Sequence, residues 1–404
     1  MQKALKTGDR RATHRGLWRP VVTLGITQII GFGSIYYAFG VLVAPVSRDL
    51  GITPTFAYGV LSMALLAGAL TAPLAGGLID RLGARRMMAA GSLASALAFA
   101  LLSRVQGAVT LAAALVLVEL VAPLVLYDAA FAALAQAVGE GRARRAITLM
   151  TMLGGFASTL FWPLTLALSE SWGWRTAWLA FAALHLLVCL PLHLWLPKIG
   201  PSQPAPGASS APFAPLPAAL HGRAMALLAL GFSLSWAVMS AFSAQWVPIL
   251  GALGLSQTAA VAAGALMGPS QVGARVIEML VAGRRHPMAT ALVAMGCLVA
   301  AVAVLALAPV SMVTASVFAV LFGVGQGLAT MVRGTVPLAL FGLGGYAARL
   351  GRLASLRMLV AAVAPFAMAA SMAAFGAGAT LTLTAALALA SLLLLAMVPW
   401  RVRG

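Results

Sequence analysis

Long apolar stretches follow one another along almost the whole chain of 404 residues, and short groups of charged residues separate them. A helix needs about 20 consecutive apolar residues to cross a bilayer. Hydrophobic residues make up 62% of the chain and charged residues only 8%, which is far from the balance of a soluble protein. We therefore predict an all-α membrane protein with twelve transmembrane helices. The predicted spans are residues 20–44, 55–79, 87–103, 108–138, 146–168, 175–196, 224–250, 257–282, 288–307, 311–340, 350–373 and 377–399.

Basic residues are concentrated on one side of the predicted membrane. Of the 26 Lys and Arg residues, Arg48, Arg104 and Arg175 fall in the opposite loops, and Arg275 and Arg333 fall within spans. All the others lie in the two tails and in the alternate loops. One of these groups is Arg349, Arg352 and Arg357. The positive-inside rule then places both termini in the cytoplasm. The net charge of +18 comes in small groups, unlike the continuous basic face of a nucleic-acid-binding protein, so we expect no nucleic-acid partner.

The stretch of residues 198–222 is rich in Pro, Ser and Ala and lacks the hydrophobicity of a span. It predicts a flexible cytoplasmic linker between an N-terminal six-helix half, residues 1–197, and a C-terminal six-helix half, residues 223–404. Two six-span halves are typical of transporters built from repeats. The basic N-terminal tail precedes a full-length span, so we expect no cleaved signal peptide. Cys189 and Cys297 both lie in apolar runs, so we expect neither a disulfide framework nor a metal site.

The segment GGLIDRLGARR, residues 76–86, lies in the predicted loop between the second and third spans. It resembles the loop signature of the major facilitator superfamily, a Gly-x-Leu-x-Asp-Arg-x-Gly pattern followed by basic residues. The matching residues are Gly76, Leu78, Asp80, Arg81 and Gly83. The basic pair comes one residue later than in that pattern. The six-plus-six spans, the linker and the GWR sequence at residues 173–175 extend the resemblance over the whole chain.

In that superfamily the loop braces the two halves on the cytoplasmic side. The resemblance therefore implies a gating role for Gly76, Asp80, Arg81 and Gly83. A neighbouring helix N-terminus or an arginine is a favourable partner for a carboxylate at Asp80. The alternative is that the basic residues of the loop only set the topology, which leaves the acid unexplained. In the second half, GRRHP at residues 283–287 lacks the matching Asp, so we expect a one-sided brace.

The eighth predicted span contains SQVGARVIEML, which is similar to the same span of the monocarboxylate transporter branch. The resemblance implies that Arg275 binds a substrate carboxylate, with Gln271 one turn earlier on the same face. A planar guanidinium suits this role because it grips a carboxylate with two hydrogen bonds. The alternative is that Glu278, three residues further on, neutralises Arg275 as a structural ion pair.

The fourth predicted span carries two acids, Glu119 and Asp128, and its sequence LYDAAFA also resembles that branch. On one continuous helix the two carboxyl groups would lie about 13.5 Å apart along the axis and on opposite faces. Glu119, near mid-depth, is the better candidate for proton coupling. Asp128 lies nearer the cytoplasm, where Arg333 or a loop arginine is a candidate partner. Both acids also fit a purely structural role.

The first span, with Gln28, Phe32 and Tyr36 spaced along one face and Tyr37 beside them, resembles the monocarboxylate and oxalate/formate branch. The resemblance implies substrate contacts for Gln28, Tyr36 and Tyr37, and helix packing is the alternative. Arg333, the second cation inside a span, is a further substrate-binding candidate. In the seventh span the corresponding positions hold Trp236, Ser240 and Gln245. For His185 and His193 in the sixth span we expect packed neutral imidazoles, with a proton relay as the alternative. GVGQG at residues 323–327 predicts close helix packing in the tenth span.

We predict a secondary active transporter that moves a small, monocarboxylate-like organic anion by alternating access, as a symporter with a proton as coupling ion. No P-loop motif is present, so no ATP-driven motor is encoded, and we expect no cofactor and no metal. One alternative is an efflux transporter for a neutral or cationic compound. The drug-exporter Gly-Pro signature is absent from the fifth span, and Arg275 disfavours a cationic substrate. A membrane-embedded enzyme is a further alternative, but clustered catalytic His and Asp are absent, so we expect no enzymatic activity.

The composition also suggests a setting for the protein. Arg greatly exceeds Lys and Ala is abundant, as in proteins from GC-rich bacteria. We therefore expect a multi-pass protein of the bacterial inner membrane. We expect it to act as a monomer whose partners are its substrate, a proton and the lipid bilayer.

Overall fold

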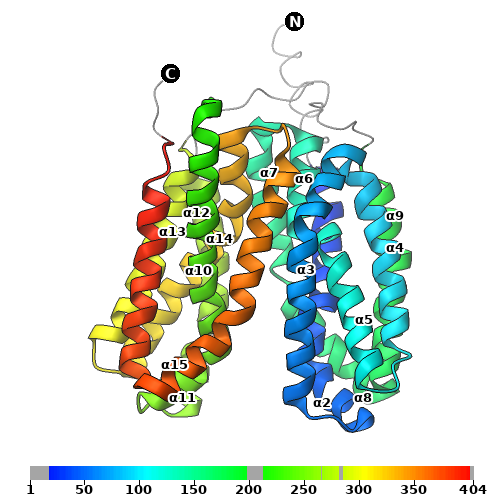
Figure 1. The fold of residues 1–404 in the computed structure, drawn as a ribbon, viewed down its shortest axis with the longest axis horizontal. Helices are drawn as coiled ribbons and strands as arrows, with labels where there is room; N and C mark the ends of the chain where they lie inside the picture. The colour runs from blue at the N-terminus through cyan, green and yellow to red at the C-terminus, as the bar shows by residue number, and fades with distance from the viewer. Residues whose placement is uncertain (1–17, 198–212, 265, 282–284, 401–404) are drawn as a thin grey trace, which may run out of the picture. The chain divides into compact units, whose positions relative to one another are not determined.

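The computed structural model describes residues 18–197, 213–264, 266–281 and 285–400 (Figure 1). Within these ranges all regular structure is helical. The chain divides into two compact units. The first contains Met1–Ala211 and Gly342–Arg352, and the second contains Pro212–Phe341 and Leu353–Gly404.

The first unit holds the spans of the N-terminal part of the chain. A helix over residues 18–31 continues without a break into a π-helical segment and a further α-helix. The elements that follow are η1 (Phe32–Tyr37), α2 (Ala38–Leu50), α3 (Pro54–Leu82), α4 (Ala84–Leu102), α5 (Ala108–Val121), η2 (Ala122–Leu124), α6 (Tyr127–Val138), α7 (Glu140–Gly154), α8 (Ala157–Leu184), η3 (His185–Cys189) and α9 (Leu190–Leu194).

The second unit is built from α10 (Ala218–Ala252), α11 (Gln257–Gly264), α12 (Met267–Val281), α13 (Pro287–Leu307), α14 (Met312–Phe341) and most of α15 (Tyr346–Ala396). The first two turns of α15 belong to the first unit. As predicted, the glycines of GVGQG allow close packing, since a Cβ at Gly323 or Gly327 would overlap backbone atoms of α12.

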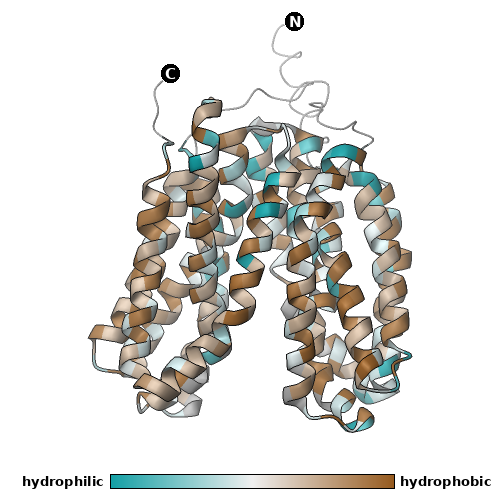
Figure 2. Cartoon of the chain, viewed as in Figure 1, coloured by the Kyte–Doolittle hydropathy of each residue, from teal (hydrophilic) through white to brown (hydrophobic). Residues whose placement is uncertain are grey.

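Nine helices in the described ranges are long and apolar enough to cross a membrane. Two of them contain two spans each, because the backbone breaks at Gly173 (φ 80°, ψ 160°) and at Gly376 (φ 80°, ψ 171°). Only glycine adopts such dihedral angles without strain. With α11 and α12, which share the eighth span, the described residues hold the predicted twelve transmembrane helices. Figure 2 shows hydrophobic residues along most of their length.

Large apolar side chains are exposed along these helices, Leu74 on α3 and Leu187 on η3 among them. An exposed apolar face of this kind is stable against lipid tails, whereas a soluble protein would bury it. The buried aromatic side chains instead pack in the interior of each unit. Phe99 stacks on Trp178 in the first unit, and Phe318 stacks on Phe322 in the second.

The segment predicted as the loop between the second and third spans is almost entirely helical. Helix α3 continues to Leu82 and α4 begins at Ala84, so Gly83 alone makes the turn, with φ 87°. Asp80 therefore lies within the last turn of α3, which fixes the direction of its carboxylate.

The fourth span is interrupted between α5 and α6. Pro123 lacks an N–H and disturbs the preceding helical turn, and Leu126 is extended (φ −84°, ψ −173°). The prediction of one continuous helix between Glu119 and Asp128 is therefore wrong. Discontinuous helices are common where transporters bind their substrates.

Most of the predicted linker, residues 198–212, lies outside the described residues. Helix α10 begins at Ala218, so residues 218–222, which the composition assigned to the linker, are helical. Just before this helix, the Leu216 N–H donates to the Leu340 carbonyl of α14 at 2.8 Å.

Candidate functional site

Asp80 binds the N-terminus of α15. One carboxylate oxygen accepts a hydrogen bond from the Ala347 N–H at 3.1 Å, and the other accepts from the Ala348 N–H at 2.7 Å. The first N–H groups of a helix have no partner within it, and a negative charge complements the positive end of the helix dipole. Arg349 on the same turn also lies within electrostatic reach of Asp80. Asp80 thus has both kinds of partner expected for it from the sequence.

Two glycines bring the backbones of α3 and α15 into direct contact beside Asp80. A Cβ atom at Gly76 would overlap the Ala347 carbonyl, and a Cβ at Gly351 would overlap the Ala72 carbonyl. Each helix therefore needs a glycine opposite the other's backbone. The sequence pattern pointed to Gly76 but missed Gly351. Of the other motif residues, Arg81 is exposed and Gly83 forms the turn into α4.

Replacing Asp80 with asparagine should weaken this α3–α15 contact. Asparagine keeps one acceptor but loses the charge, which is worth about 0.3–2 kcal/mol at a helix N-terminus. We expect slower turnover with little change in substrate affinity, measured by transport and binding assays on the same preparation. Glu170→Gln, which removes an exposed charge from α8, is the control. Wild-type turnover in Asp80→Asn would contradict a role for this contact in gating.

The first-span candidates do not share one environment. Gln28 is fully buried, whereas Tyr36 is 61% exposed and packs edge-on against Tyr37. The segment Phe32–Tyr37 is π-helical, which changes the angular spacing, so the prediction of one α-helical stripe through Gln28 and Tyr36 is wrong. Gln28 instead binds the break in the fourth span, because its Nε2 donates to the Val125 carbonyl at 2.7 Å.

The two acids of the fourth span lie on either side of its break. Glu119, near the end of α5, is 3% exposed, and the backbone of α3 approaches it closely at Gly68. The Tyr36 hydroxyl lies within electrostatic reach of Glu119. Asp128 is half-buried in the first turn of α6, where a carboxylate complements the helix dipole. The two acids of the fourth span therefore lie in different environments.

Each of the two histidines of the sixth span is buried against a serine of another helix. His185 Nε2 is 2.9 Å from Ser34 Oγ, and His193 Nδ1 is 2.7 Å from Ser92 Oγ. These contacts fit the predicted packed imidazoles and join the sixth span to the first and third. In the described ranges, no group of three or more His, Cys, Asp or Glu side chains is placed to hold a metal.

In the second unit, the residues predicted around Arg275 contact α14. Gln271 Nε2 donates to Gln326 Oε1 at 2.7 Å, and Arg275 Nε donates to the Gly327 carbonyl at 3.2 Å. Arg275 is buried, with 5% of its surface exposed. Glu278 Oε1 accepts a hydrogen bond from Thr290 of α13 at 2.6 Å. The sequence indicated Gln271 and Arg275 but not Gln326, the partner of Gln271.

A further buried arginine was misplaced by the sequence interpretation. Arg357 was grouped with the cytoplasmic loop residues, but it lies inside α15 and is 6% exposed. Arg333 on α14 is 8% exposed. Both guanidinium groups lie over the ring of Trp236 on α10, at 4.8 Å for Arg357 and 5.4 Å for Arg333. Among the described residues of the second unit, three arginines, not two, are therefore buried within the spans.

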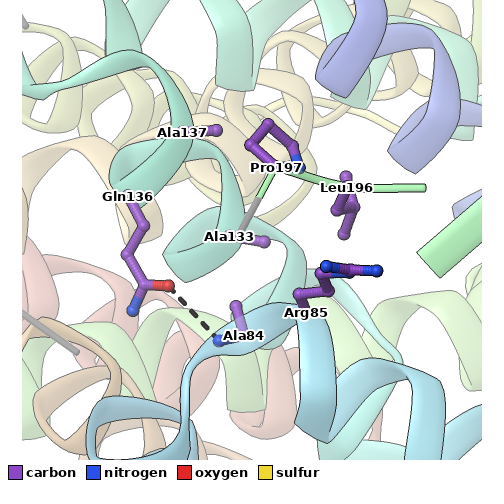
Figure 3. A pocket seen from close by; sticks show the side chains of 7 residues that line it. All are labelled: Ala84, Arg85, Ala133, Gln136, Ala137, Leu196 and Pro197. Atoms are coloured by element: carbon purple, nitrogen blue, oxygen red, sulfur yellow. Dashed lines mark hydrogen bonds between the residues drawn. The ribbon is translucent and has the colours of Figure 1, made fainter. Parts of the chain in front are cut away.

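The first unit has a small pocket whose lining includes none of these candidate substrate residues (Figure 3). Its lining consists of Ala84, Arg85, Ala133, Gln136, Ala137, Leu196 and Pro197. Gln136 Oε1 accepts a hydrogen bond from the Ala84 N–H at the start of α4, at 3.3 Å. Arg85 Nε donates to the Leu194 carbonyl at 2.8 Å. The polar groups of this pocket thus hold helix ends together.

The fold, the loop motif and the two sets of buried polar residues lead to one family. A sequence model of the Major Facilitator Superfamily matches residues 24–365. The chain belongs to the Major Facilitator Superfamily. The superfamily assignment predicted from the sequence is confirmed, and the protein is a multi-pass membrane transporter, not an enzyme.

Solved structures of the superfamily share this fold. The human organic anion transporter MFSD10 (TETRAN) is 17% identical, with a TM-score of 0.73 and coverage of 94% of this chain and 99% of that one. The transporter FucP in the outward conformation is 14% identical, with the same TM-score and the same coverage. At these identities the likeness concerns the fold alone. A search of curated proteins gives no match.

Proposed function

We propose that this superfamily member is a secondary active transporter of a small organic anion, with a carboxylate as the anionic group. The halves formed by residues 1–197 and 223–404, joined by the linker 198–222, would alternate in access. The observation that carries the proposal is the balance of buried charge in the C-terminal half.

In this half, Arg275, Arg333 and Arg357 are each at most 8% exposed. The sequence from residue 223 to 404 contains a single acid, Glu278. Charged residues within a membrane span are costly, and they commonly mark the pathway of a substrate or ion. An anionic substrate would offset the excess of buried positive charge in this half.

The comparison with solved structures is consistent with this substrate class, since one neighbour of the same fold is an organic anion transporter. The alternative, efflux of a cationic or neutral compound, is disfavoured by the same buried arginines. A cation would be repelled by them, and a neutral molecule would leave their charge unchanged.

We propose Glu119 as the proton-coupling residue and Asp128 as a secondary candidate. Glu119 is buried on a helix that is interrupted directly after it, beside the exposed Tyr36. Buried carboxyl groups in transporter spans are typical proton carriers. In this scheme the protein is a symporter of the bacterial inner membrane that works as a monomer.

We predict that both termini lie in the cytoplasm. A topology reporter fused after Gly404 should read cytoplasmic, and one inserted near Gln106, between α4 and α5, should read external. Both fusions can be made in one strain, so each serves as the control for the other. A cytoplasmic signal near Gln106 would contradict the proposed orientation.

A ligand screen tests the substrate class. Purified protein is heated with mono- and dicarboxylates of matched chain length, with sugars, and with cationic antibiotics, and its melting temperature is recorded. A ligand at 100 times its Kd stabilises the folded state by about 2.7 kcal/mol, so a true substrate should raise the melting temperature measurably. Stabilisation by carboxylates supports the proposal, whereas stabilisation by cations alone would overturn it.

A further inference from the structure

The indole ring of Trp236 contacts two arginines from two different helices. The Cζ atoms of Arg357 and Arg333 lie 4.8 Å and 5.4 Å from its centre. Because both guanidinium groups are near one ring, their Cζ atoms are at most about 10 Å apart. One carboxylate or dicarboxylate can therefore be within reach of both guanidinium groups. The ring therefore gathers two positive charges at one place.

Hydrogen bonds one and two turns further along fix α15 against α10. Ser240 Oγ donates to the Ala361 carbonyl at 2.8 Å, and Gln245 Nε2 donates to the Pro365 carbonyl at 3.4 Å. The contacting positions are 236, 240 and 245 on α10, and their partners are 357, 361 and 365 on α15. Both series increase together along the chain. The two helices therefore run parallel at this contact, and Arg357 is held in register with the indole ring.

The Ser240 hydrogen bond has a specific cause. In an α-helix the Ala361 carbonyl would accept from the N–H of residue 365, but Pro365 has no N–H. The Ser240 hydroxyl supplies the missing donor from the neighbouring helix, as is usual for prolines in membrane spans. The proline is thus tolerated just beyond Arg357 because α10 compensates for it, which makes Ser240 a positioning residue for Arg357.

The face of α14 that carries Arg333 is polar over two turns. Gln326, Thr330 and Arg333 are spaced by four and three residues and lie on one face. Gln326 contacts Gln271 on α12, one turn from Arg275. Arg333, which contacts Trp236, and Gln326, which contacts α12 one turn from Arg275, therefore lie along the same face of α14, about 10 Å apart along its axis.

We propose that Arg333 and Arg357 bind the carboxylate of the substrate and that Trp236 holds both guanidinium groups in place when no substrate is bound. This inference rests on the proposed organic anion transport and names the binding residues. A bidentate guanidinium–carboxylate contact is stronger than a cation–π contact, so a carboxylate that binds both arginines changes their position over the ring. The indole ring then reports on binding, because its cationic neighbours move when the anion arrives.

The experiment follows Trp fluorescence and melting temperature of the purified full-length protein during titration with mono- and dicarboxylates of matched length. Arg357→Gln should weaken carboxylate binding by about tenfold or more, since a charged hydrogen bond contributes about 1.5–3 kcal/mol. Trp236→Phe, which keeps an aromatic face but removes the indole, should abolish most of the fluorescence change, and carboxylate binding followed by melting temperature should persist but be weaker than in wild type. The controls are Arg352→Gln, an exposed arginine on the same helix, and Trp172→Phe, an exposed tryptophan.

Two further variants test the role of the Arg357 guanidinium group and of its position. Arg357→Lys retains the charge without the planar fork, so it should fold and still bind weakly. Ser240→Ala should weaken binding by a smaller factor than Arg357→Gln, with the exposed Ser243→Ala as its control. If one carboxylate bridges both arginines, monocarboxylates bind as tightly as dicarboxylates; if each arginine takes its own carboxylate, dicarboxylates bind more tightly.

The outcomes separate this inference from the proposed function. Wild-type binding in both Arg357→Gln and Arg357→Lys, with binding lost in Arg275→Gln, would overturn the inference and place the carboxylate at Arg275. A wild-type protein that responds to no carboxylate at all would overturn the proposed function and the inference with it.

Discussion

Gly76→Ala is expected to abolish most transport, whereas Gly77→Ala is expected to leave it nearly unchanged. A Cβ at Gly76 would overlap the Ala347 carbonyl of α15, while a Cβ at Gly77 meets nothing within 4 Å. Forcing an atom into a packed contact costs about 1–3 kcal/mol. The substitution would weaken the α3–α15 contact that Asp80 also stabilises by accepting hydrogen bonds from two backbone N–H groups of α15. A cost of this size shifts a conformational equilibrium by about 5- to 150-fold.

The two variants are a matched pair, since they are adjacent on one helix and both introduce a single methyl group. Transport in proteoliposomes and thermal unfolding should be measured for both. We expect Gly77→Ala to match or slightly exceed wild-type stability, because alanine favours the helix. Gly351→Ala, on the other helix, should reproduce the Gly76→Ala defect. Equal transport in Gly76→Ala and Gly77→Ala would show that the α3–α15 contact is not needed for turnover.

Arg275→Ala and Glu278→Ala are each expected to destabilise the protein, and the double variant is expected to remain destabilised. Arg275 donates to the Gly327 carbonyl on α14, and Glu278 accepts from Thr290 on α13. Each charged hydrogen bond contributes about 1.5–3 kcal/mol. Because these contacts join α12 to two different helices, the double variant loses both of them and should be no more stable than either single variant.

This prediction decides between the two interpretations of Arg275 that the sequence left open. If Arg275 only neutralises Glu278 as a structural pair, removing one partner leaves a buried charge, and the double variant should regain stability. A double-variant cycle of thermal or denaturant unfolding in detergent measures the coupling directly, and Ser243→Ala, at an exposed site, is the control for the preparation. Recovery of both stability and transport in the double variant would contradict a substrate role for Arg275.

The sequence predicted the number of spans and the importance of Asp80 because both depend on local signals. A span is a run of apolar residues, and an acid among basic residues has no topological reason to be there. The break in the fourth span was also within reach, since Pro123 stands in the middle of an apolar run. It was missed because hydropathy alone does not distinguish a continuous helix from an interrupted one.

The arginine cluster could not be predicted in the same way. Arg357 follows Arg349 and Arg352 closely, so it was counted with their loop group. Its burial depends on where α15 begins and on contact with Trp236, more than 100 positions earlier in the chain. Gly351 was missed for the same reason, because only the packed α3–α15 pair shows what a side chain there would meet. Pairings between distant helices are set by tertiary packing, which a single sequence does not display.

The central claim is that this transporter moves an organic anion together with a proton. Its most direct test is uptake of a labelled carboxylate into proteoliposomes under an imposed pH gradient, with protein-free vesicles to subtract passive entry. We expect wild-type protein to accumulate the carboxylate when the uptake side is acidic, and Glu119→Gln to lose this dependence on the gradient. No protein-dependent uptake of any carboxylate, together with uptake or extrusion of a cationic compound, would contradict the claim.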